Sequence, residues 1–593
     1  MNKSAEKLAL LRAALYQNNI DAYIIPSSDP HLGENIPDHW RIIEWLTGFT
    51  GSSATVVITD SFAGLWTDSR YFIQAQDQLA GSGFRLIKPE TYKSSDYSDF
   101  IAESIKPEGA IGLDGRIFSI SRFRKLDKKL KPGQIRINNN CDFITDLWAN
   151  RPAMPDSIGF DHPVELCGKE RARKIAEVRE QMKERNINYH LLTSSDDIMW
   201  LLNIRGNDVK YTPLLISFAL IGLKQILFFA NENKIPVKLS AEFDELGIVI
   251  LPYEETSGII SAISEKATIL IDPETTSVSL FNSISKELNI IEDISIPSRL
   301  KAVKNKTEIN SISRAMIKDG IALTLFFNWF ENRPASHSLT EVMLADKILE
   351  FRSQQKDFLG ASFAAIVAFN ANSALPHYTP VRGSDSEITD NGILLVDSGT
   401  QYMDGTTDIT RTISTGIPTA GQKKDFTLVL KGHINLALAK FPAGTRGYQL
   451  DTLARKFLWD SGLNFGHGTG HGVGFCLNVH EGPQSISPAN NKTAIERGML
   501  ISNEPAIYRE GEYGIRIENL ILCYEDEETE FGQFLKFDTI SLCYIDKSLI
   551  DSSLLNKEEI KWLNLYHKEV YEKLSPWLSG EEKIWLKEKT DPL

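Results

Sequence analysis

Two aspartates flank a predicted turn in the segment LLVDSGTQYMDGTTDITRT (394–412). This pattern predicts a strand, an Asp-Gly turn at 404–405 and a returning strand. We therefore expect Asp397 and Asp408 to lie on neighbouring strands, where their carboxylates can face one point.

Two glutamates repeat this pattern in the segment ISNEPAIYREGEYGIRIEN (501–519). A glycine-containing turn near 511–514 would place Glu504 almost opposite Glu518. If both pairs meet, four carboxylates lie close together, and they would repel one another strongly unless cations lay between them. The spacing of these acidic residues therefore favours a metal site.

Two histidines, His467 and His471, project from the glycine-rich segment GHGTGHGVG (466–474), which lies between the two predicted hairpins. No Lys-Ser or Lys-Thr follows these glycines, so the segment resembles a phosphate loop only superficially. A zincin motif is also excluded, because no Glu follows His467 and a helix does not tolerate so many glycines. Oxygen-rich ligation with one imidazole favours manganese, cobalt or zinc.

Each fragment also has a simpler explanation. Asp404 and Gly405 can form only a turn, Asp397 can cap a strand end, and Glu518 can be a surface residue. The ordered set Asp, Asp, His, Glu, Glu is much less easily explained by chance than any one of its members.

The elements that must position these residues follow two similar segments. NIDAYIIPSSD (19–29) and EWLTGFTG (44–51) precede a predicted strand pair, and NINYHLLTSSD (186–196) and MWLLNIRG (199–206) precede another. The preserved order of five elements favours a duplication over chance similarity between two ordinary α/β units.

We predict three domains for this chain of 593 residues. Two similar α/β domains occupy residues 1–155 and 156–300, and a third domain occupies residues 301–593. The third domain opens with a long amphipathic helix at 304–330 and ends in a helical tail at 546–593. The acidic run EDEETE (525–530) is most simply a solvated hairpin loop.

Composition limits the classes of partner. The net charge of −14 disfavours a general affinity for nucleic acid or anionic membranes. The N-terminal 19 residues predict an amphipathic helix and not a signal peptide, and the longest apolar stretches reach about half of the roughly 20 residues that cross a bilayer. Five widely spaced cysteines, none of them in a CxxC arrangement, argue against a disulfide framework. We therefore expect a cytoplasmic protein.

At these residues the chain resembles the pita-bread metallopeptidases, and most closely the three-domain Xaa-Pro aminopeptidases. The resemblance extends over the whole chain. It is carried by the segments WTDSRYF (66–72), PHYTP (376–380), VLKGHI (429–434), HGTGHGVG (467–474), NVHEGP (478–483), NEPAIY (503–508), GIRIEN (514–519) and WLNLYH (562–567). It implies a fold of two creatinase-like α/β domains followed by a pita-bread catalytic domain.

The resemblance also implies a role for each matching residue. Two divalent metal ions, most simply Mn²⁺ with Zn²⁺ or Co²⁺ as alternatives, would be bound by Asp397, Asp408, His471, Glu504 and Glu518. Catalytic or substrate-binding roles would fall to His377, His467, His480, Arg70 and Arg516. Asn503 and Ala506 flank Glu504 where the family commonly has Asp and Gly, which affects the local backbone and leaves the ligands unchanged.

The implied reaction is removal of the first residue from peptides that have proline at the second position. A hydroxide bridging two metal ions would attack the carbonyl before proline, with Glu504 as proton acceptor. The implied partners are such peptides and a second copy of the chain in a homodimer, with no nucleic acid or membrane.

Two enzymatic rivals and one binding protein share this fold. A prolidase, which cleaves only dipeptides, has the same five ligands, but two tandem N-terminal domains favour the aminopeptidase. A histone-binding relative that has lost its metals is disfavoured by the intact ligand set, and a creatinase-like hydrolase is disfavoured for the same reason.

Overall fold

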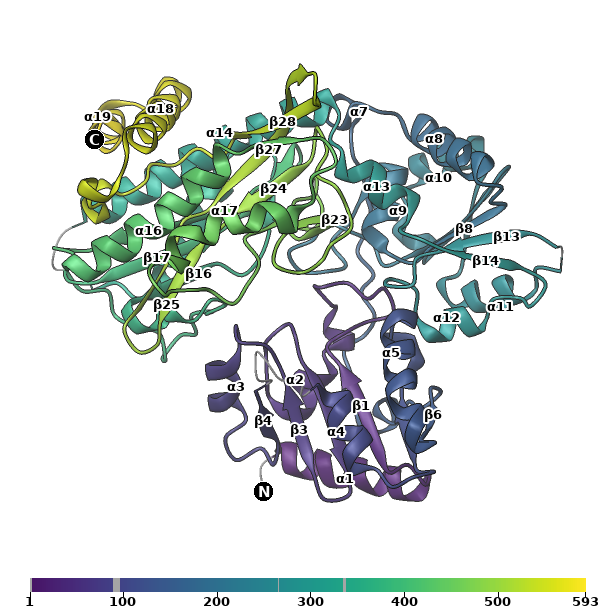
Figure 1. Cartoon of the computed structure of the whole chain (residues 1–593). Coiled ribbons are helices and arrows are strands. Elements are labelled where there is room, and N and C mark those ends of the chain that lie inside the picture. Colours follow the sequence, from purple (N-terminus) through teal and green to yellow (C-terminus); the bar gives the residue numbers. More distant parts are fainter. Residues whose placement is uncertain (1–2, 89–95, 265, 334–337) are drawn as a thin grey trace. The chain divides into compact units, whose positions relative to one another are not determined.

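The computed structural model describes residues 3–88, 96–264, 266–333 and 338–593. They separate into two compact units, which are coloured along the chain in Figure 1. Unit 1 comprises Met1–Asp161, Lys169–Lys210 and Leu214–Pro297, and unit 2 comprises His162–Gly168, Tyr211–Pro213 and Ser298–Leu593. The predicted domain limits at residues 155 and 300 remain predictions, because these units group the chain differently.

Unit 1 contains two six-stranded sheets with one topology. The first has the order β4-β3-β2-β1-β5-β6 and the second the order β12-β11-β10-β8-β13-β14. In each sheet a central strand, β1 or β8, pairs antiparallel with one neighbour and parallel with the other. The repeated order of elements in the sequence therefore corresponds to a repeated sheet.

The first sheet consists of β1 (Ala22–Pro26), β2 (Thr55–Thr59), β3 (Ala63–Trp66), β4 (Arg85–Ile87), β5 (Ala110–Leu113) and β6 (Arg136–Asn138). The second consists of β8 (Tyr189–Leu192), β10 (Phe218–Gly222), β11 (Ile226–Phe229), β12 (Ile248–Leu251), β13 (Thr268–Ile271) and β14 (Asn289–Glu292). A small ladder joins β7 (Phe160–Asp161) to β9 (Ile204–Arg205).

Helices cover both sheets of unit 1. The longer ones are α1 (Lys3–Gln17), α3 (Phe72–Gln78), α4 (Tyr97–Ser104), α5 (Ile120–Leu130), α8 (Arg171–Glu184), α9 (Ser195–Leu202) and α10 (Val237–Glu245). Helix α13 (Ile296–Ala302) begins at the end of unit 1 and continues into unit 2. The predicted amphipathic helix at the N-terminus is α1, which buries Leu8, Leu11 and Leu15. This spacing places the three leucines on one face.

Unit 2 holds the predicted metal ligands and every other predicted site residue except Arg70. The predicted long helix is α14 (Lys306–Glu331), which begins after Asn305 because the Asn305 side chain accepts hydrogen bonds from the amides of Thr307 and Glu308. The other long helices are α15 (Glu341–Ser353), α16 (Ala420–Ala437), α17 (Gly447–Trp459), α18 (Lys557–Leu574) and α19 (Gly580–Thr590).

The strands of unit 2 form several sheets. A six-stranded sheet has the order β21-β28-β27-β24-β22-β23, and a three-stranded sheet has the order β16-β17-β20. The strands of the larger sheet are β21 (Lys440–Pro442), β22 (Gly470–Gly472), β23 (Glu481–Ile486), β24 (Leu500–Asn503), β27 (Asn519–Thr529) and β28 (Gly532–Thr539). The others are β15 (Phe358–Ala361), β16 (Ile366–Phe369), β17 (Ile393–Ser398), β18 (Thr400–Tyr402), β19 (Gly405–Thr406), β20 (Ile409–Ser414), β25 (Ala506–Arg509) and β26 (Tyr513–Arg516).

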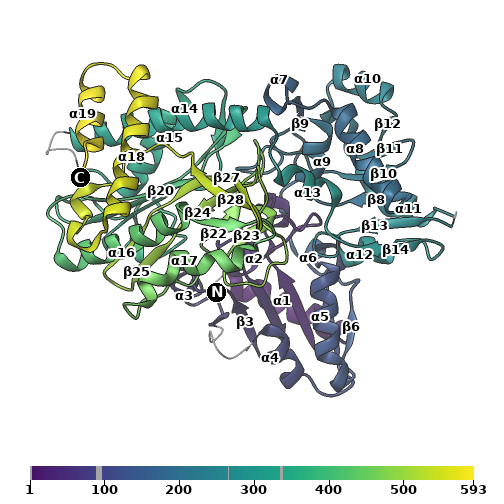
Figure 2. The same ribbon diagram turned by 45° about the horizontal axis from the view of Figure 1, so that its top comes forward.

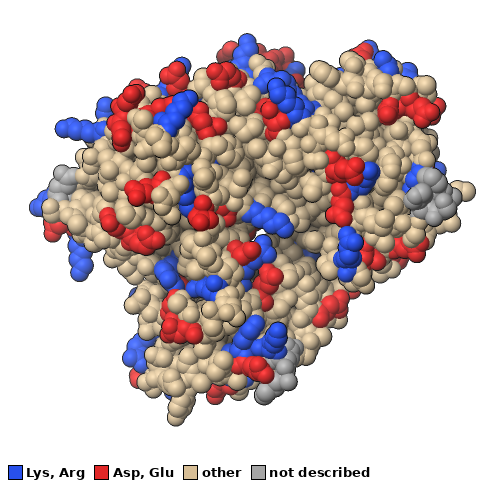
Figure 3. Space-filling model, turned by 180° about the vertical axis from the view of Figure 1, so that it is seen from behind, with Lys and Arg blue, Asp and Glu red and all other residues tan. Residues whose placement is uncertain are grey.

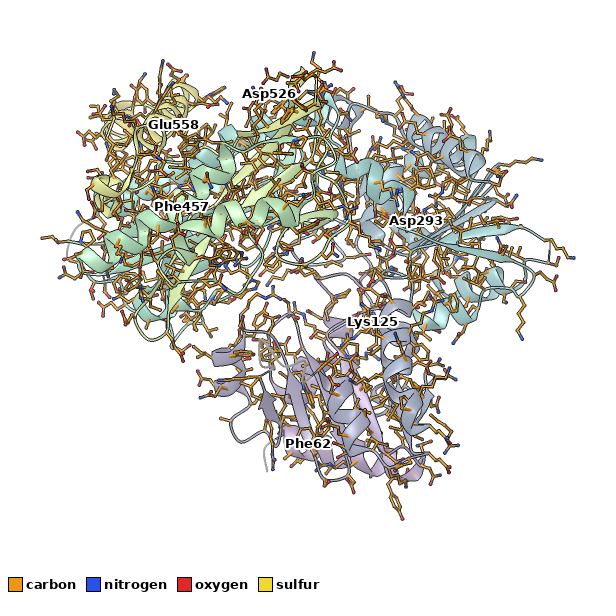
Figure 4. The ribbon with its side chains drawn as sticks, viewed as in Figure 1. Phe62, Lys125, Asp293, Phe457, Asp526 and Glu558 are labelled. Atoms are coloured by element: carbon orange, nitrogen blue, oxygen red, sulfur yellow. The ribbon has the colours of Figure 1, made fainter. Side chains whose placement is uncertain are left out.

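Helix packing buries the core of unit 2. Helices α16 and α17 pack together, and Lys431 lies 4.7 Å from the ring centre of Phe457, which Figure 4 labels on α17. Helices α18 and α19, yellow in Figure 2, pack on α14, and α18 also contacts α16. The C-terminal tail is thus helical as predicted, although its first long helix begins only at Lys557.

The acidic run at 525–530 differs from the prediction. It lies mostly within β27 and not in a loop, and Figure 4 labels Asp526 there. Lys440 forms ion pairs with Asp526 and Glu527, and Lys536 forms one with Asp526. Lys536 lies on β28, which pairs with β27, and Lys440 lies on β21, the next strand beyond β28. Both lysines offset the repulsion that favoured a loop.

All five cysteines are free and buried. Among the helices that the structure describes, none combines the length and the apolar character needed to cross a bilayer.

Lys234 and Asp208 form a buried ion pair in unit 1, and the carboxylate has hydrogen-bond donors besides the ammonium group. Lys234 Nζ lies 2.7 Å from Asp208 Oδ2, and the two side chains are 6% and 0% exposed. The carboxylate also accepts hydrogen bonds from the amides of Ser157 and Ile216 and from the Ser157 hydroxyl. Asp208 therefore keeps three donors if Lys234 is removed.

We predict an asymmetric loss of stability. Asp208→Ala should cost about 3–5 kcal/mol because it leaves a buried ammonium without its carboxylate. Lys234→Met should cost less, since the carboxylate keeps its other donors. Thermal unfolding of both variants measures the difference, and equal losses would contradict this account.

Candidate metal centre

Asp397 and Asp408 enter the site from the three-stranded sheet. Asp397 lies in β17, which pairs antiparallel with β20 so that Asp397 faces Thr410 across the ladder. Asp408 lies two residues before Thr410, at the entrance to β20. Both aspartates are buried. The predicted strand, turn and returning strand are confirmed, but the turn residues of the small β18–β19 hairpin are 403–404, one position earlier than predicted.

Glu504 and Glu518 enter from the six-stranded sheet. Strands β24 and β27 pair antiparallel with Asn503 opposite Asn519. Glu504 directly follows Asn503 and Glu518 directly precedes Asn519, so the two glutamates lie opposite each other as predicted. The connecting hairpin, β25 with β26, pairs Ala506 with Arg516 and turns at 510–512.

His471 brings an imidazole to these carboxylates from β22. Its Nε2 atom lies 3.5 Å from Asp408 Oδ2 and 3.6 Å from Glu504 Oε1. One ligand atom each of Asp408, His471 and Glu518 lies within 4.8 Å of the other two. The His471 Nδ1 atom lies 2.9 Å from the Gly472 carbonyl oxygen, which can only accept. The proton therefore belongs on Nδ1, and the Nε2 lone pair faces the carboxylates.

The electrostatics of this cluster are unfavourable without added positive charge. Burial raises the pKa of Asp408 well above its usual value, and the neighbouring Asp397 raises it further. Burial also raises the pKa of Glu518, as do the charges of Asp408 and Glu504. The pKa of Glu504 is raised to about 7, chiefly by burial. Removing these groups from water and placing them side by side disfavours their ionised forms.

The donor set fits divalent cations. Asp397 Oδ1 is buried and has no hydrogen-bond donor in the described part of the chain. A cation would satisfy that oxygen and neutralise the carboxylates around it. Several carboxylates with one imidazole match the ligand preferences of manganese, zinc and cobalt.

Arg516 places a buried positive charge directly against the carboxylates. It donates hydrogen bonds to Asp397 Oδ2 at 2.5 Å, to Thr410 Oγ1 at 3.2 Å and to the Tyr508 hydroxyl at 2.5 Å. Thr410 Oγ1 in turn donates to Glu518 Oε2 at 2.8 Å. One guanidinium thus orients a carboxylate from each sheet.

Tyr508 is a site residue that sequence reasoning missed. Its hydroxyl lies 2.9 Å from His467 Nε2, so the chain of hydrogen bonds continues from Arg516 to His467. Burial raises the pKa of Tyr508 to about 12, which keeps the phenol protonated. Its position in the segment NEPAIY, four residues after Glu504, was the available signal.

His480 and His377 are the remaining histidines predicted for the site. The ring of His480 packs edge-on against that of His471, with 4.2 Å between ring centroids. His377 follows the short helix η6 (Asn370–Ala374), which packs against β17 and β26, the strands of Asp397 and Arg516. The roles of both histidines remain predictions.

Arg70 lies in unit 1, between β3 and α3. Its guanidinium donates two hydrogen bonds to Asp68, at 2.7 and 2.8 Å, and its amide donates a third at 3.1 Å. Arg70 thus takes part in a local ion pair within its own loop. Its predicted contact with substrate remains a prediction.

Family models cover most of the chain. Two models of the creatinase and prolidase N-terminal domain match residues 7–139 and 150–308. A model of metallopeptidase family M24 matches residues 310–525, and a model of the C-terminal region of that peptidase matches residues 533–593. The chain thus has the domains of a creatinase-type metallopeptidase, and the predicted fold class is confirmed.

Similarity to individual proteins identifies the family within this class of metallopeptidases. A probable Xaa-Pro aminopeptidase P from Talaromyces marneffei is 38% identical, over 100% of this chain and 92% of the relative. Aminopeptidase P2 from Arabidopsis thaliana is 38% identical over 99% of this chain and 88% of its own length. The crystal structure of an X-prolyl aminopeptidase from Caenorhabditis elegans, described as a cytosolic enzyme with a di-nuclear active site, matches with a TM-score of 0.96 and 36% identity over 100% of both chains. The chain therefore belongs to the Xaa-Pro aminopeptidase P family of M24 metallopeptidases.

We predict that Glu504→Gln stabilises the metal-free protein at high pH. The pKa of Glu504 is about 7 in the folded chain against an ordinary value of 4.5. Between these values the folded state binds more protons than the unfolded state, so the free energy of unfolding falls as pH rises. Glutamine cannot ionise and avoids this loss, which amounts to about 3 kcal/mol at most.

Melting temperatures with a chelator measure this effect. At pH 8 the variant should melt several degrees above the wild type, and below pH 4.5 the two should coincide. Saturating divalent cation should reverse the order at pH 8, because the wild type then gains more from the ligand. If Glu504→Gln, measured with a chelator, is less stable than the wild type at pH 8, then ionised Glu504 does not destabilise the metal-free protein and the prediction is wrong.

Proposed function

We propose that this chain is a dinuclear aminopeptidase that removes the N-terminal residue from peptides with proline at the second position. The observation that carries the proposal is the convergence of Asp408, His471 and Glu518 at one point. Near-full-length similarity to Xaa-Pro aminopeptidases supports the substrate class. An active site with two metal ions is attributed to the Caenorhabditis elegans relative, and the surplus of carboxylates here supports the same number.

Five residues would hold the ions: Asp397, Asp408, His471, Glu504 and Glu518. Manganese is the metal we propose, because oxygen donors outnumber the single imidazole, and zinc and cobalt are the alternatives. When bound, such ions polarise a peptide carbonyl and lower the pKa of water.

Proton transfer falls to Glu504. Its Oε1 atom lies 3.3 Å from the Ser502 hydroxyl, which orients the carboxyl group. We assign Glu504 to take a proton from the attacking water and pass it to the proline nitrogen as the C–N bond breaks. The products are then a free amino acid and a shortened peptide with a secondary amine at its end.

The histidines are assigned to substrate. His480, edge-on to His471, can donate an N–H to the carbonyl oxygen as negative charge develops there. His467 is oriented through the Tyr508 hydroxyl, and His377 follows a helix that packs on the strands of the site. Arg516 stabilises the ligand carboxylates through its bond to Asp397.

A dedicated enzyme for these bonds has a physical reason. The nitrogen of proline carries no hydrogen, so a peptidase cannot grip an N–H at that position. The ring also restricts the residue before it to extended conformations. A site that selects proline at the second position therefore recognises shape and the free terminal amine, which the ligand carboxylates can attract.

We also propose a cytoplasmic location and a homodimer. A cytosolic relative and five free cysteines support the location. Acidic and basic side chains are interspersed on the face drawn in Figure 3, where the coloured residues form no broad basic area. The net charge of −14 is the reason that nucleic acid and anionic membranes are not among the proposed partners.

Asp408→Asn should abolish peptidase activity and weaken metal binding by at least about tenfold, because a carboxylate that serves both ions loses its charge while its shape is kept. Elemental analysis and release of arginine from Arg-Pro-Pro provide the two measurements. Asp425→Asn is the control, since this buried carboxylate pairs with Arg509 and Tyr513. Full metal content and normal turnover in Asp408→Asn would contradict the assignment.

Peptide length separates the aminopeptidase from a prolidase. We predict that Arg70→Ala lowers kcat/KM for tripeptides and longer Xaa-Pro peptides. The lost transition-state stabilisation should be about 1–3 kcal/mol, the size of a lost charge-assisted hydrogen bond. Metal content should not change. If Arg70 only forms a local ion pair with Asp68, the variant and the wild type should have the same kcat/KM at every peptide length. A wild type that cleaves only dipeptides would favour prolidase.

A further inference from the structure

Two segments that carry the family resemblance, VLKGHI (429–434) and WLNLYH (562–567), lie outside the proposed ligand set. They supply His433 on α16 and Tyr566 on α18, which are 0% and 4% exposed. Burying these polar side chains is costly unless their atoms are hydrogen-bonded. Their partners lie beside the proposed ligands.

His433 connects the two strands that carry the glutamates. Its Nδ1 atom lies 3.1 Å from the Asn503 carbonyl oxygen, which accepts, and its Nε2 atom accepts from Asn519 Nδ2 at 3.0 Å. Asn503 Nδ2 donates back to the His433 carbonyl oxygen at 2.9 Å. Because Asn503 precedes Glu504 and Asn519 follows Glu518, one imidazole fixes both strands at the ligands.

The imidazole is suited to a fixed structural role. Burial, together with the charge of Arg411, lowers the pKa of His433 to about 3. The ring therefore stays neutral, with one donor and one acceptor, and both are used.

Arg411 connects the same place to the C-terminal region. Its NH1 atom donates to the carbonyl oxygens of Glu518 at 2.7 Å and Thr410 at 2.8 Å. Its NH2 atom donates at 2.8 Å to both Asn519 Oδ1 and the Tyr566 hydroxyl. The remaining acceptors are the carbonyl oxygens of Tyr544 and Cys543. The guanidinium, 2% exposed, thus links a proposed ligand to the tail.

Aromatic packing closes this network. The Tyr566 ring stacks on Trp562 with an interplanar angle of 6° and a centroid separation of 5.3 Å. Trp562 in turn packs edge-on against His433 at 5.8 Å. Helix α18, which Figure 2 shows in yellow, therefore covers the network and contacts α16 directly.

We propose that His433, Arg411, Asn519 and Tyr566 are positioning residues that hold Glu504 and Glu518 at the spacing the metal ions require. Helix α18 thereby controls metal affinity without supplying a ligand. The inference rests on the proposed function only in taking these glutamates as ligands. Groups that orient metal ligands commonly change affinity 10- to 100-fold when removed.

Tyr566→Phe tests the inference because it removes one hydroxyl and keeps the stacked ring. We expect Mn²⁺ to bind at least about tenfold more weakly, measured by competition with a fluorescent chelator. Tyr544→Phe is the matched control: Tyr544 is also a buried tyrosine beside this network, but its hydroxyl donates to Glu331 at 3.4 Å, and the bond from Arg411 to its carbonyl oxygen is untouched. The control should keep wild-type affinity for Mn²⁺.

The outcomes are separable. Wild-type Mn²⁺ affinity in Tyr566→Phe, or equal losses in both variants, would overturn the inference. If Tyr566→Phe does not fold, His433→Asn replaces it, since this change loses the bond to Asn519 and should also weaken Mn²⁺ binding by about tenfold. A wild type that binds two Mn²⁺ ions but cleaves no Xaa-Pro peptide would contradict the proposed function alone.

Discussion

Mutual repulsion among buried and half-buried carboxylates is the constraint on which the rest of unit 2 depends. Asp397, Asp408, Glu504 and Glu518 come from two different sheets, and burial together with neighbouring charge raises the pKa of the last three. A chain gains nothing in stability from such an arrangement, since each ionised carboxylate costs several kcal/mol to remove from water. Cations that neutralise these carboxylates would therefore bind favourably at this point. The fold around the site must keep the carboxylates from separating.

The hydrogen bonds around the site serve that purpose from two sides. Arg516 holds Asp397 and, through Thr410, Glu518, so the two sheets are tied across the cluster. His433 and Arg411 hold the backbone next to Glu504 and at Glu518 from the side of α16 and α18. Both arginines donate several bonds in fixed directions, which a planar guanidinium does at little loss of side-chain freedom. Rigid support of this kind lets ligands face one another while no metal is bound.

Sequence reasoning predicted the parts of this arrangement that depend on local pattern. The pairing of Glu504 with Glu518 follows from hairpin spacing, because an antiparallel register is set by the length of its turn. The repeated sheet of unit 1 was predicted because each copy preserves the same order of strands, and helix α1 was predicted because its leucines recur on one face. The acidic run at 525–530 was assigned wrongly, since the lysines that stabilise it as a strand come from β21 and β28.

Residues whose role depends on distant partners could not be predicted in this way. Tyr508 meets His467 across 41 positions, and Tyr566 meets Arg411 across 155. No periodicity or motif spacing encodes such a meeting, because it arises only when separate elements pack. This explains why the partners of these side chains could not be predicted, although the segments NEPAIY (503–508) and WLNLYH (562–567) that contain two of them carry the family resemblance. A buried hydrogen-bonding group with every partner satisfied is costly to assemble and specifies one arrangement of its neighbours. At this site that arrangement would keep Glu504 and Glu518 together against their repulsion, so we assign helix α18 to the proposed metal centre although it contributes none of the proposed ligands.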